Sequence, residues 1–483
     1  MDTATEDEAF LRDVQRIQFS PFFSRLADVT QVVSPASPGS PVHNRLTHSL
    51  KVSAIAQGIA RRLADHHGVE VPSRVVQAAS CAHDVGHPPF GHLGERVLDR
   101  LARHELGLPD GFEGNAQTYR ILTALAVTGG VERGLGLTSQ TRAAVAKYPW
   151  SPLIAQDPAA LPDGEIPKGL QHRGGAWQVP KYSCYVIDEP DLVAAREAVG
   201  AVPLRQTLAA SVMDIADDIA YSVHDLEDFY RSGILSYAEV ALEFNTFVED
   251  AHELVDAELP STTVAGADDL PPGGALEKLR RKIRRKDGWV YDADIFYDSV
   301  VQVRDELVDG LLARPFDASL AAEHATAEFT DRWITLLGNG IVPTPVDTLR
   351  AGPVTLDART WHLVEVLKFV HKRFVLSRTD LAVYQRGLSE VLQRSVRSLV
   401  EWTDDRLDAS RVPRRLRDLI AIAEEQYAAR ALYVPQGTAP IAQQARARAV
   451  LDYVSSFTDT QALAFAEAIS GRSDRLWSLG RAL

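Results

Sequence analysis

The segment Ser80–Glu95, SCAHDVGHPPFGHLGE, places three histidines, one aspartate and one glutamate within sixteen residues. An apolar helical run from Arg74 onward leads into the adjacent His83 and Asp84, and the glycine and prolines that follow must end that helix. Few purely structural explanations account for so many imidazole and carboxylate groups beside one turn. The segment therefore predicts a helix that delivers two ligand-type side chains to a site at its C-terminal end.

Two other helical stretches carry polar side chains on one face. In NRLTHSLKVSAIAQGIARRL, Arg45 and His48 are three residues apart and share a face. In SVMDIADDIAYSVHDLED, Asp217, Tyr221 and Asp225 recur at spacings of four. A mixed set of imidazoles and carboxylates suits magnesium or a divalent transition metal. The candidate metal ligands are His48, His83, Asp84 and Asp217.

The His83-Asp84 doublet resembles the signature of the HD-domain phosphohydrolases, in which four ligands come from separate helices of a bundle. The order of HNRLTHSLKV, AHDVGHPPFGHLGE, FEGNAQ, KYPW and DIADDIAYSVHDLEDFY is similar to that of the deoxyguanosinetriphosphate triphosphohydrolase-like branch. Segments near both ends, RDVQRIQFSPFFSRLADVTQV and ARAVLDYVSSFTDTQAL, also resemble that branch. The resemblance implies an all-α fold: an HD-domain helical bundle with an additional helical C-terminal region and long irregular insertions.

The resemblance also implies a reaction, the hydrolysis of a deoxynucleoside triphosphate, dGTP or several dNTPs, to a deoxynucleoside and inorganic triphosphate. The divalent metal, Mn²⁺, Mg²⁺ or another transition metal, would act on the phosphate as a Lewis acid. His92 and Glu95, three residues apart, can pair so that one imidazole nitrogen stays free to take a proton from water. Positive charge for the phosphate oxygens is expected from His87, Arg45, Lys147 and Lys181.

The nucleoside end of the substrate is expected to meet a second group of residues. Tyr221 can stack under the sugar, where a 2′-hydroxyl would clash, and Asp225 can accept a hydrogen bond from the 3′-hydroxyl. By resemblance, Gln31 lies beside the deoxyribose, although a glutamine in a turn can equally bond only to backbone. The C-terminal candidates for nucleotide contacts are Arg378, Tyr384 and Gln385, which could also be structural residues of an amphipathic helix.

Glu113 has two readings of equal weight. It stands at the first turn of a predicted helix, where the helix dipole favours an acidic side chain without any catalytic task. The same position would also allow it to act in the active site and contact the substrate. The residue pattern alone leaves both open.

The chain divides by composition into three parts. Residues 1–258 are expected to form the catalytic core, including a Pro/Gly-rich loop at 148–181 that is too irregular for a helix or strand. A loop of that length in a compact enzyme usually serves as a lid or an interface. Residues 259–274 read as a linker, and residues 275–483 as a helical region that completes the substrate pocket and the oligomer interface.

Charge and cysteine content limit the partners and the cellular compartment that can be expected for this chain. The chain has 51 basic and 65 acidic residues, so its net charge of -14 disfavours general nucleic-acid coating. Two cysteines, the lack of an apolar N-terminal segment and the lack of any run near ~20 apolar residues predict a cytoplasmic protein without a membrane span. The resemblance adds a homo-oligomer, with a hexamer expected.

One local exception to the acidic balance is KLRRKIRRK, residues 278–286, with seven positive charges in nine positions. It is either a solvated helix face or a site for an effector, a phosphate-bearing nucleotide or single-stranded DNA.

Two alternatives to the main function also stay open: a generic HD-domain phosphodiesterase or nucleotidase, and a catalytically inert nucleotide sensor. The presence of all four candidate ligands and of His92 argues against the sensor.

Overall fold

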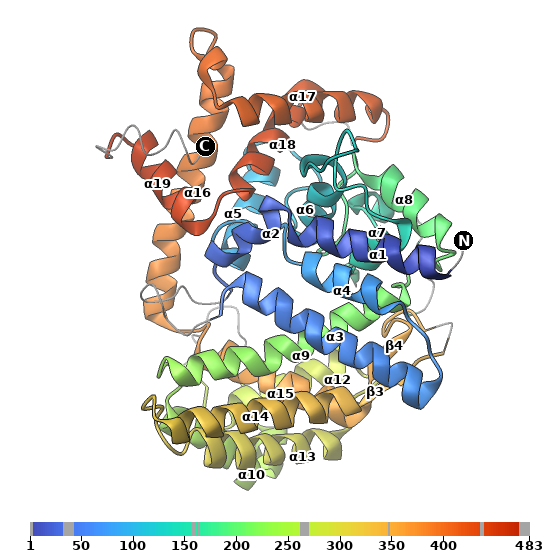
Figure 1. Ribbon diagram of the computed structural model, residues 1–483. Helices are drawn as coiled ribbons and strands as arrows, with labels where there is room; N and C mark the ends of the chain where they lie inside the picture. The colour runs from blue at the N-terminus through green and yellow to red at the C-terminus, as the bar shows by residue number, and fades with distance from the viewer. Residues whose placement is uncertain are drawn as a thin grey trace.

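The computed structural model describes residues 3–31, 43–156, 161, 165–260, 270–345, 348–434 and 439–472. Within these ranges the chain forms nineteen α-helices and two antiparallel two-stranded sheets (Figure 1). The predicted all-α fold class is confirmed. No helix in the described ranges is both long and apolar enough to cross a bilayer.

Three helices form the centre of the molecule: α3 (Arg45–His67), α4 (Ser73–Ala82) and α9 (Leu208–Arg231), each packed against the other two. Asn44 starts α3 by accepting a hydrogen bond from the Thr47 N–H, and Gly68, with φ 63°, ends it. Most of α9 is buried, so its polar residues are held in fixed surroundings. In Figure 1, α9 lies directly beside α3.

The remaining N-terminal elements surround this centre. The helices are α1 (Thr3–Gln18), α2 (Pro21–Arg25), α5 (Gly91–His104), α6 (Gly114–Arg120), α7 (Ser139–Val145) and α8 (Glu189–Ala198). Short 3₁₀ turns cover Leu26–Asp28 and Pro152–Gln156, and a π-helical turn follows α6 at Ile121–Leu125.

A second layer covers the other side of α9, in the lower half of Figure 1. Helices α14 and α15 contact α9 directly, and α13 packs on α15. Strand β4 also contacts α9. The elements of this layer are α10 (Tyr237–Glu249), α11 (Ala251–Asp256), α12 (Gly274–Lys286), α13 (Ala293–Val303), a π-helical segment (Arg304–Leu311), α14 (Leu320–Asn339), β3 (Ile341–Pro343), β4 (Val354–Leu356) and α15 (Ala358–Phe374).

The C-terminal helices return to the N-terminal core. They are α16 (Thr379–Asp404), α17 (Arg414–Ala429), α18 (Ile441–Ser455) and α19 (Asp459–Ile469), with a 3₁₀ turn at Ala409–Arg411. Asp452 accepts a hydrogen bond of 2.8 Å from Nε of the buried Arg120. Asp459 accepts from the backbone N–H of Phe90 at 2.7 Å, where Phe90 has the unusual φ of 64°. The C-terminal signature therefore holds the turn that begins α5.

The loop at 148–181 contains more regular structure than the sequence pattern suggested. Strands β1 (Gln171–Arg173) and β2 (Ala176–Gln178) form a hairpin in which Gln171 pairs with Gln178. The expectation of no strand was wrong, because Gly174 and Gly175 both have positive φ and form the tight turn that a two-residue hairpin needs. Most of the predicted linker at 259–274 lies outside the described residues.

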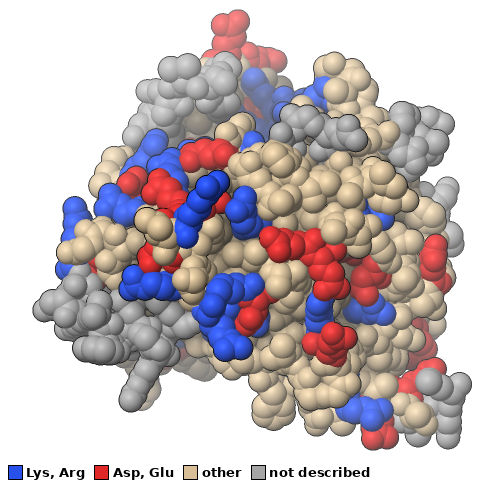
Figure 2. All heavy atoms as spheres, turned by 90° about the horizontal axis from the view of Figure 1, so that it is seen from above, with Lys and Arg blue, Asp and Glu red and all other residues tan. Residues whose placement is uncertain are grey.

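Charged side chains are mixed over the surface. On the face seen from above in Figure 2, basic and acidic groups lie next to one another, with uncharged residues between them. That face offers no extended, purely basic surface, which agrees with the negative net charge.

Candidate active site

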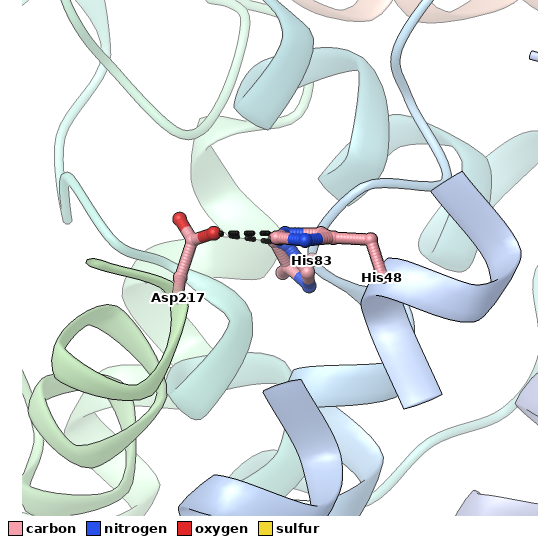
Figure 3. A group of neighbouring side chains, drawn as sticks. All are labelled: His48, His83 and Asp217. Carbon is pink, nitrogen blue, oxygen red and sulfur yellow. Dashed lines mark hydrogen bonds and ion pairs between the residues drawn. The ribbon is translucent and has the colours of Figure 1, made fainter. Parts of the chain in front are cut away.

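The three central helices bring His48, His83 and Asp217 together, with one ligand-type atom of each within 4.8 Å of the others. His48 Nε2 lies 3.1 Å from Asp217 Oδ1, and His83 Nε2 lies 3.6 Å from the same oxygen. Figure 3 shows the two imidazoles and the carboxylate pointing toward one another. Three of the four predicted metal ligands are therefore assembled from separate parts of the chain.

His83 is oriented by the chain around it. It follows the last turn of α4, and its Nδ1 is bonded to the carbonyl of Ser80 at 2.7 Å, so Nε2 faces Asp217. Within the described ranges, this buried Nε2 has no hydrogen-bond partner. Burial opposes a charge on the ring, but Asp84 and Asp217 outweigh it and raise the pKa of His83 to about 9. A buried imidazole nitrogen facing two carboxylates fits a divalent cation.

Asp84 lies beside this group and is shared among several partners. Its Oδ1 is 3.5 Å from His83 Nε2 and 2.9 Å from His87 Nδ1, while its Oδ2 accepts a bond of 2.6 Å from Arg45 Nη1. Burial raises the pKa of Asp84, but Arg45 and the histidines together hold it well below the usual value. Asp84 is thus an anion beside His83, held by its bond to Arg45, and its role as the fourth metal ligand stays a prediction.

The HPP turn that links α4 to α5 depends on close backbone packing. A Cβ on Gly86 would lie 2.0 Å from the backbone N of Thr118, so only glycine fits there. The Gly86 N–H also donates to Thr118 Oγ1 at 3.0 Å. This packing places His87, His92 and Glu95 in a second group whose ligand-type atoms also lie within 4.8 Å of one another.

Within the second group, His92 Nδ1 lies 3.0 Å from Glu95 Oε2, which confirms the predicted contact between the two side chains. His92 is 54% exposed, whereas Glu95 is 10% exposed. Burial raises the pKa of Glu95, but the bond to His92 and the charge of Lys181 bring it well below the usual value. The ring centroids of His87 and His92 are 5.0 Å apart, and His87 Nδ1 contacts Asp84. The His92–Glu95 pair is therefore connected through His87 and Asp84 to the group of His48, His83 and Asp217, called the metal-type group below.

His87 does not have the charge that the sequence analysis expects. Burial and the nearby Arg45 outweigh Asp84 and lower the pKa of His87 to about 4. The ring is therefore neutral at neutral pH and can act there as a hydrogen-bonding group. It does not supply the positive charge assigned to it.

Glu113 caps a helix, which is one of its two predicted roles, and it also lies beside Lys181. Its contact with the substrate stays a prediction. Its Oε2 accepts from the backbone N–H groups of Asn115 and Ala116 and so caps α6. Its Oε1 also meets Lys181 Nζ at 2.9 Å, and the same Nζ lies 2.7 Å from Glu95 Oε1. A cavity of about 640 Å³ opens beside Glu95, lined by His92, Arg96, Lys181 and Tyr182 among others.

A row of lysines and carboxylates continues from Asp217 along α9. Lys147 Nζ lies 2.9 Å from Asp217 Oδ2 and 2.6 Å from Asp214 Oδ1. Lys168 Nζ lies 2.9 Å from Asp214 Oδ2 and 3.4 Å from Asp218 Oδ2. Lys147 was predicted from its motif, whereas Lys168, Asp214 and Asp218 were missed.

The row ends on α15. Lys368 Nζ lies 3.0 Å from Asp218 Oδ1 and 3.0 Å from Glu365 Oε1. Lys168 could have been noticed because it stands in the same irregular loop as Lys181. Lys368 had no such signal, since it is one of several basic residues on an ordinary amphipathic helix.

Three residues were predicted to contact the nucleoside: Gln31, Tyr221 and Asp225. Two of them are buried and have a side-chain oxygen without a hydrogen-bond partner in the described part of the chain. Gln31 is buried, and its Oε1 has no hydrogen-bond partner among the described residues. Asp225 is also buried, and burial together with Asp228 raises its pKa well above the usual value. Tyr221 packs edge-on against His371, with ring centres 4.4 Å apart. Their role as nucleoside contacts stays a prediction.

The C-terminal candidates lie at the surface. Arg378 pairs with Asp380 at 2.8 Å and contacts the carbonyl of Ile234, and Tyr384 is 49% exposed. The described contacts of Arg378 do not include any of the residues gathered around Asp217. Arg378, Tyr384 and Gln385 stay predictions.

The chain is similar to a family model and to several known proteins. Residues 45–118 match the model of the HD domain family. A deoxyguanosinetriphosphate triphosphohydrolase-like protein of Streptomyces coelicolor is 32% identical over 474 residues, covering 96% of this chain and 93% of its own length. A protein of the same description from Corynebacterium glutamicum (strain ATCC 13032) is 41% identical over 229 residues, 47% of this chain and 46% of its own length.

A relative from Mesorhizobium japonicum, deoxyguanosinetriphosphate triphosphohydrolase-like protein 2, is 39% identical over 254 residues, 50% of this chain and 49% of its own length. The match to the Streptomyces protein extends along nearly the whole of both chains, so the likeness is not confined to the HD segment. The chain therefore belongs to the deoxyguanosinetriphosphate triphosphohydrolase-like family of HD-domain phosphohydrolases.

Proposed function

We propose that this protein hydrolyses a deoxynucleoside triphosphate, dGTP or several dNTPs, at the α-phosphorus and releases a deoxynucleoside and inorganic triphosphate. The observation that carries the proposal is the contact between two groups, the His48–His83–Asp217 trio and the His92–Glu95 pair, through His87 and Asp84. One group suits a divalent metal, and the other suits proton transfer. Together they supply the two functions that metal-assisted hydrolysis of a phosphate ester uses, a Lewis acid and a proton acceptor.

In this proposal His48, His83, Asp84 and Asp217 hold the divalent metal, with manganese, magnesium and other transition metals as candidates. When bound, the metal would polarise a phosphate oxygen as a Lewis acid. Neighbouring residues of the chain orient the metal-binding side chains. Ser80 fixes His83, and Arg45 fixes Asp84, so the ligands need little rearrangement.

His92 is the proposed proton acceptor. Glu95 Oε2 lies 3.0 Å from Nδ1 of His92 and favours the tautomer in which Nδ1 carries the proton, which leaves Nε2 free. In the reaction the water oxygen bonds to the α-phosphorus, the bond from that phosphorus to the 5′-oxygen breaks, and the water proton passes to Nε2. The 5′-oxygen leaves as part of the deoxynucleoside and takes up one proton from solvent water, and the proton held on Nε2 passes to the solvent, so that the imidazole is neutral again.

Cationic side chains are proposed to meet the phosphate oxygens. Arg45 is buried beside Asp84, and Lys147 and Lys181 each bond to carboxylates of the site. Burial lowers the pKa of Lys147, but Asp214 and Asp217 outweigh it, so the ammonium group keeps its charge. These cations would stabilise the negative charge that builds up in the transition state.

At the nucleoside end, Tyr221 is proposed to lie under the deoxyribose, with Asp225 at the 3′-hydroxyl and Gln31 at the sugar edge. The support is that Asp225 and Gln31 each keep one buried oxygen without a hydrogen-bond partner among the described residues. Buried polar atoms in that condition are costly unless a ligand bonds to them. The raised pKa of Asp225 also favours a neutral carboxyl group, which can donate as well as accept.

We further propose a homo-oligomer, a hexamer by family resemblance, in the cytoplasm. Leu407 and Leu432 are 94% and 93% exposed and lie in the C-terminal region, where a subunit interface would cover them. Both cysteines, Cys81 and Cys184, are free and buried, as suits a reducing compartment. We also propose that the basic segment, residues 278–286, binds an effector, either a nucleotide or single-stranded DNA.

The direct test is chromatography of the products from each deoxynucleoside triphosphate, with Mn²⁺ or Mg²⁺ supplied. We expect equal amounts of deoxynucleoside and intact triphosphate. Release of orthophosphate or pyrophosphate, or activity only on monophosphates or cyclic nucleotides, would indicate the generic phosphodiesterase or nucleotidase. Tight nucleotide binding without any product would indicate the sensor.

A further inference from the structure

Asp459 joins two segments of the active site that are far apart in the sequence. Its Oδ2 accepts hydrogen bonds from the backbone N–H of Thr30 at 3.0 Å and from Thr30 Oγ1. Its Oδ1 accepts from the backbone N–H of Phe90 at 2.7 Å. Thr30 precedes Gln31, a proposed sugar contact, and Phe90 lies two residues before His92, the proposed proton acceptor. One carboxylate therefore ties the sugar side of the site to the proton-transfer side.

The carboxylate of Asp459 is not needed to start its own helix. Asp459 is the first residue of α19, where the helix dipole favours an acidic side chain. The helix is already capped, because the Thr458 hydroxyl accepts from the Gln461 N–H and the Gln461 side chain accepts from the Thr458 N–H. Both oxygens of Asp459 instead bond to other parts of the chain. These bonds therefore serve the junction with Thr30 and Phe90.

The turn that Asp459 holds has an unusual backbone conformation. Phe90 has φ 64° and Gly91 has φ 57°, so two successive residues lie in the left-handed region, which a bulky residue such as phenylalanine rarely adopts. A backbone of this kind costs on the order of 1–3 kcal/mol and persists only where its surroundings hold it. The bond from the Phe90 N–H supplies such support. Because α5 begins at Gly91, this turn determines where His92 lies.

The same turn packs directly on the segment that contains Thr30. A Cβ on Gly91 would lie 2.9 Å from the carbonyl oxygen of Thr30 and 2.7 Å from Arg45 Nη2. Arg45 Nε donates to the same carbonyl at 3.1 Å, and its Nη1 bonds to Asp84. The junction of Thr30, Gly91 and Arg45 therefore connects the turn to a candidate metal ligand.

A second residue ties the other end of the turn to the same part of the C-terminal region. Arg25 Nη2 donates to the carbonyls of Val85 at 3.0 Å and His87 at 2.6 Å. Nη1 of the same buried guanidinium donates to the carbonyl of Phe457 at 2.7 Å. The segment that carries His87 is thus held at one end through Arg25 and at the other through the carboxylate described above. Residues 457–459 therefore form part of the frame that holds the active-site turn.

We infer that Asp459 is a positioning residue for the reaction, which holds His92 and Gln31 at a fixed separation on the two sides of the bound nucleotide. The inference rests on the proposed function and deepens it. The described hydrogen bonds of the Asp459 side chain go to two backbone N–H groups and one threonine hydroxyl. It therefore acts through Phe90 and Thr30 and takes no part in proton transfer.

Asp459→Asn tests this, because the amide keeps the size of the side chain but can no longer accept at both oxygen positions. We expect kcat for a deoxynucleoside triphosphate to fall about 10-fold or more, since small displacements of a catalytic group are costly. Bound Mn²⁺ and the melting temperature should stay near the wild-type values. Asp294→Asn is the matched control: it makes the same change at an exposed position in the first turn of α13 and should leave kcat unchanged.

Combination with His92→Ala separates positioning from a general structural effect. If Asp459 acts through His92, Asp459→Asn should lower kcat by less than about 2-fold in the His92→Ala background. A general loss of structure would instead lower kcat by equal factors with and without His92. Equal factors, or wild-type kcat in Asp459→Asn alone, would overturn the inference.

The sugar side is tested in the same way through KM. Asp459→Asn should raise KM about 3-fold or more, as for one weakened hydrogen bond, because Gln31 is displaced with Thr30. In the Gln31→Ala background the further rise should be less than about 2-fold. An undiminished rise in that background would show that Asp459 does not act through Gln31.

Hydrogen–deuterium exchange measures the tie without turnover. In Asp459→Asn the backbone amides of Thr30 and Phe90 should exchange about 10-fold faster or more, whereas Asp294→Asn should keep the wild-type rates at both. Wild-type exchange at both amides in Asp459→Asn would also overturn the inference. If the wild type releases no triphosphate from any deoxynucleotide, the proposed function fails, and the exchange rates still decide whether Asp459 ties the two segments together.

Discussion

His48 Nε2 lies 3.1 Å from Asp217 Oδ1, although 169 residues separate them in the chain. His83 joins the pair from a third helix end, so the trio depends on the packing of α3, α4 and α9. We predict that His83→Ala and Asp217→Ala each lower bound Mn²⁺ to about a tenth of the wild-type content or less. Metal analysis of the purified proteins measures this, with circular dichroism as the check that the helices persist. Wild-type metal content in both variants would refute the ligand assignment.

The His92–Glu95 pair predicts a loss of rate without a loss of metal. His92→Ala should lower kcat by ~10²–10⁴-fold, because the proton acceptor is removed. Glu95→Gln should have a smaller effect, since the imidazole remains but its tautomer is no longer fixed by a carboxylate. Metal content and nucleotide affinity serve as controls. Turnover by His92→Ala at the wild-type rate would exclude His92 as the acceptor.

We predict that Tyr221 gives the enzyme its preference for deoxyribonucleotides over ribonucleotides. Its ring is held edge-on against His371 at 4.4 Å, so it cannot easily move away from an added 2′-hydroxyl. Tyr221→Ala should reduce the ratio of kcat/KM for a dNTP over the matching ribonucleotide by about 10-fold or more. Tyr221→Phe keeps the ring and should retain the preference. If Tyr221→Ala discriminates as well as the wild type, another residue excludes the 2′-hydroxyl.

Asp188 predicts a pH dependence of stability. Burial, only partly offset by Arg120, raises the pKa of its carboxyl to about 6, whereas an unfolded chain would have about 3.9. Between these values the folded state binds more protons than the unfolded state, so the contribution of Asp188 to stability falls as pH rises from about 4 to about 6. The full difference is roughly 3 kcal/mol.

Asp188→Asn removes this titration. Urea unfolding at several pH values should show that the variant gains stability relative to the wild type as pH rises through the window. A difference between the two proteins that stays constant with pH would contradict the prediction. The comparison cancels other groups, such as Asp84 and Glu95, whose lowered pKa values give the opposite slope.

The arginines of the basic segment 278–286 are of two kinds: some pair with a buried carboxylate, and others are exposed to solvent. Arg280 and Arg281 both pair with the fully buried Glu277, and Arg281 also donates to the carbonyls of Leu254, Val255 and Ala257. Arg284 and Arg285 are exposed. Arg280→Glu should therefore cost about 3 kcal/mol or more in stability, since it removes one of the two cations that pair with the buried Glu277 and places a second carboxylate beside it.

Reversal of Arg284 and Arg285 to glutamate should leave the melting temperature nearly unchanged but weaken activation by nucleotides or single-stranded DNA. The loss should be greatest at low salt, where such contacts are strongest. Wild-type activation and salt dependence in the double variant would leave only a solvated helix face.

The metal-type group was predictable because its signals are local. An adjacent His83-Asp84 doublet at a helix end and the spacing of four between Asp217 and Tyr221 can be read from one chain. The contact of His92 with Glu95 follows from a spacing of three on one helix turn. In each case the local period fixes which way the side chains point.

Other features depend on long-range packing and were not predictable. The contact from Lys368 to Asp218 spans 150 residues, and helical periodicity does not say which lysine turns inward. Asp459 supports Phe90 across 369 residues. The β1–β2 hairpin was different: the Gly174-Gly175 pair between short polar segments is a turn signal, and the density of prolines and glycines around it concealed it.

The most direct test of the central claim follows the oxygen atom of the attacking water. The nucleotide that is turned over fastest would be hydrolysed in water enriched in ¹⁸O, and both products analysed by mass spectrometry. Attack at the α-phosphorus predicts one ¹⁸O atom in the released triphosphate and an unlabelled deoxynucleoside. Label in the deoxynucleoside, or release of pyrophosphate or orthophosphate in place of triphosphate, would contradict the account.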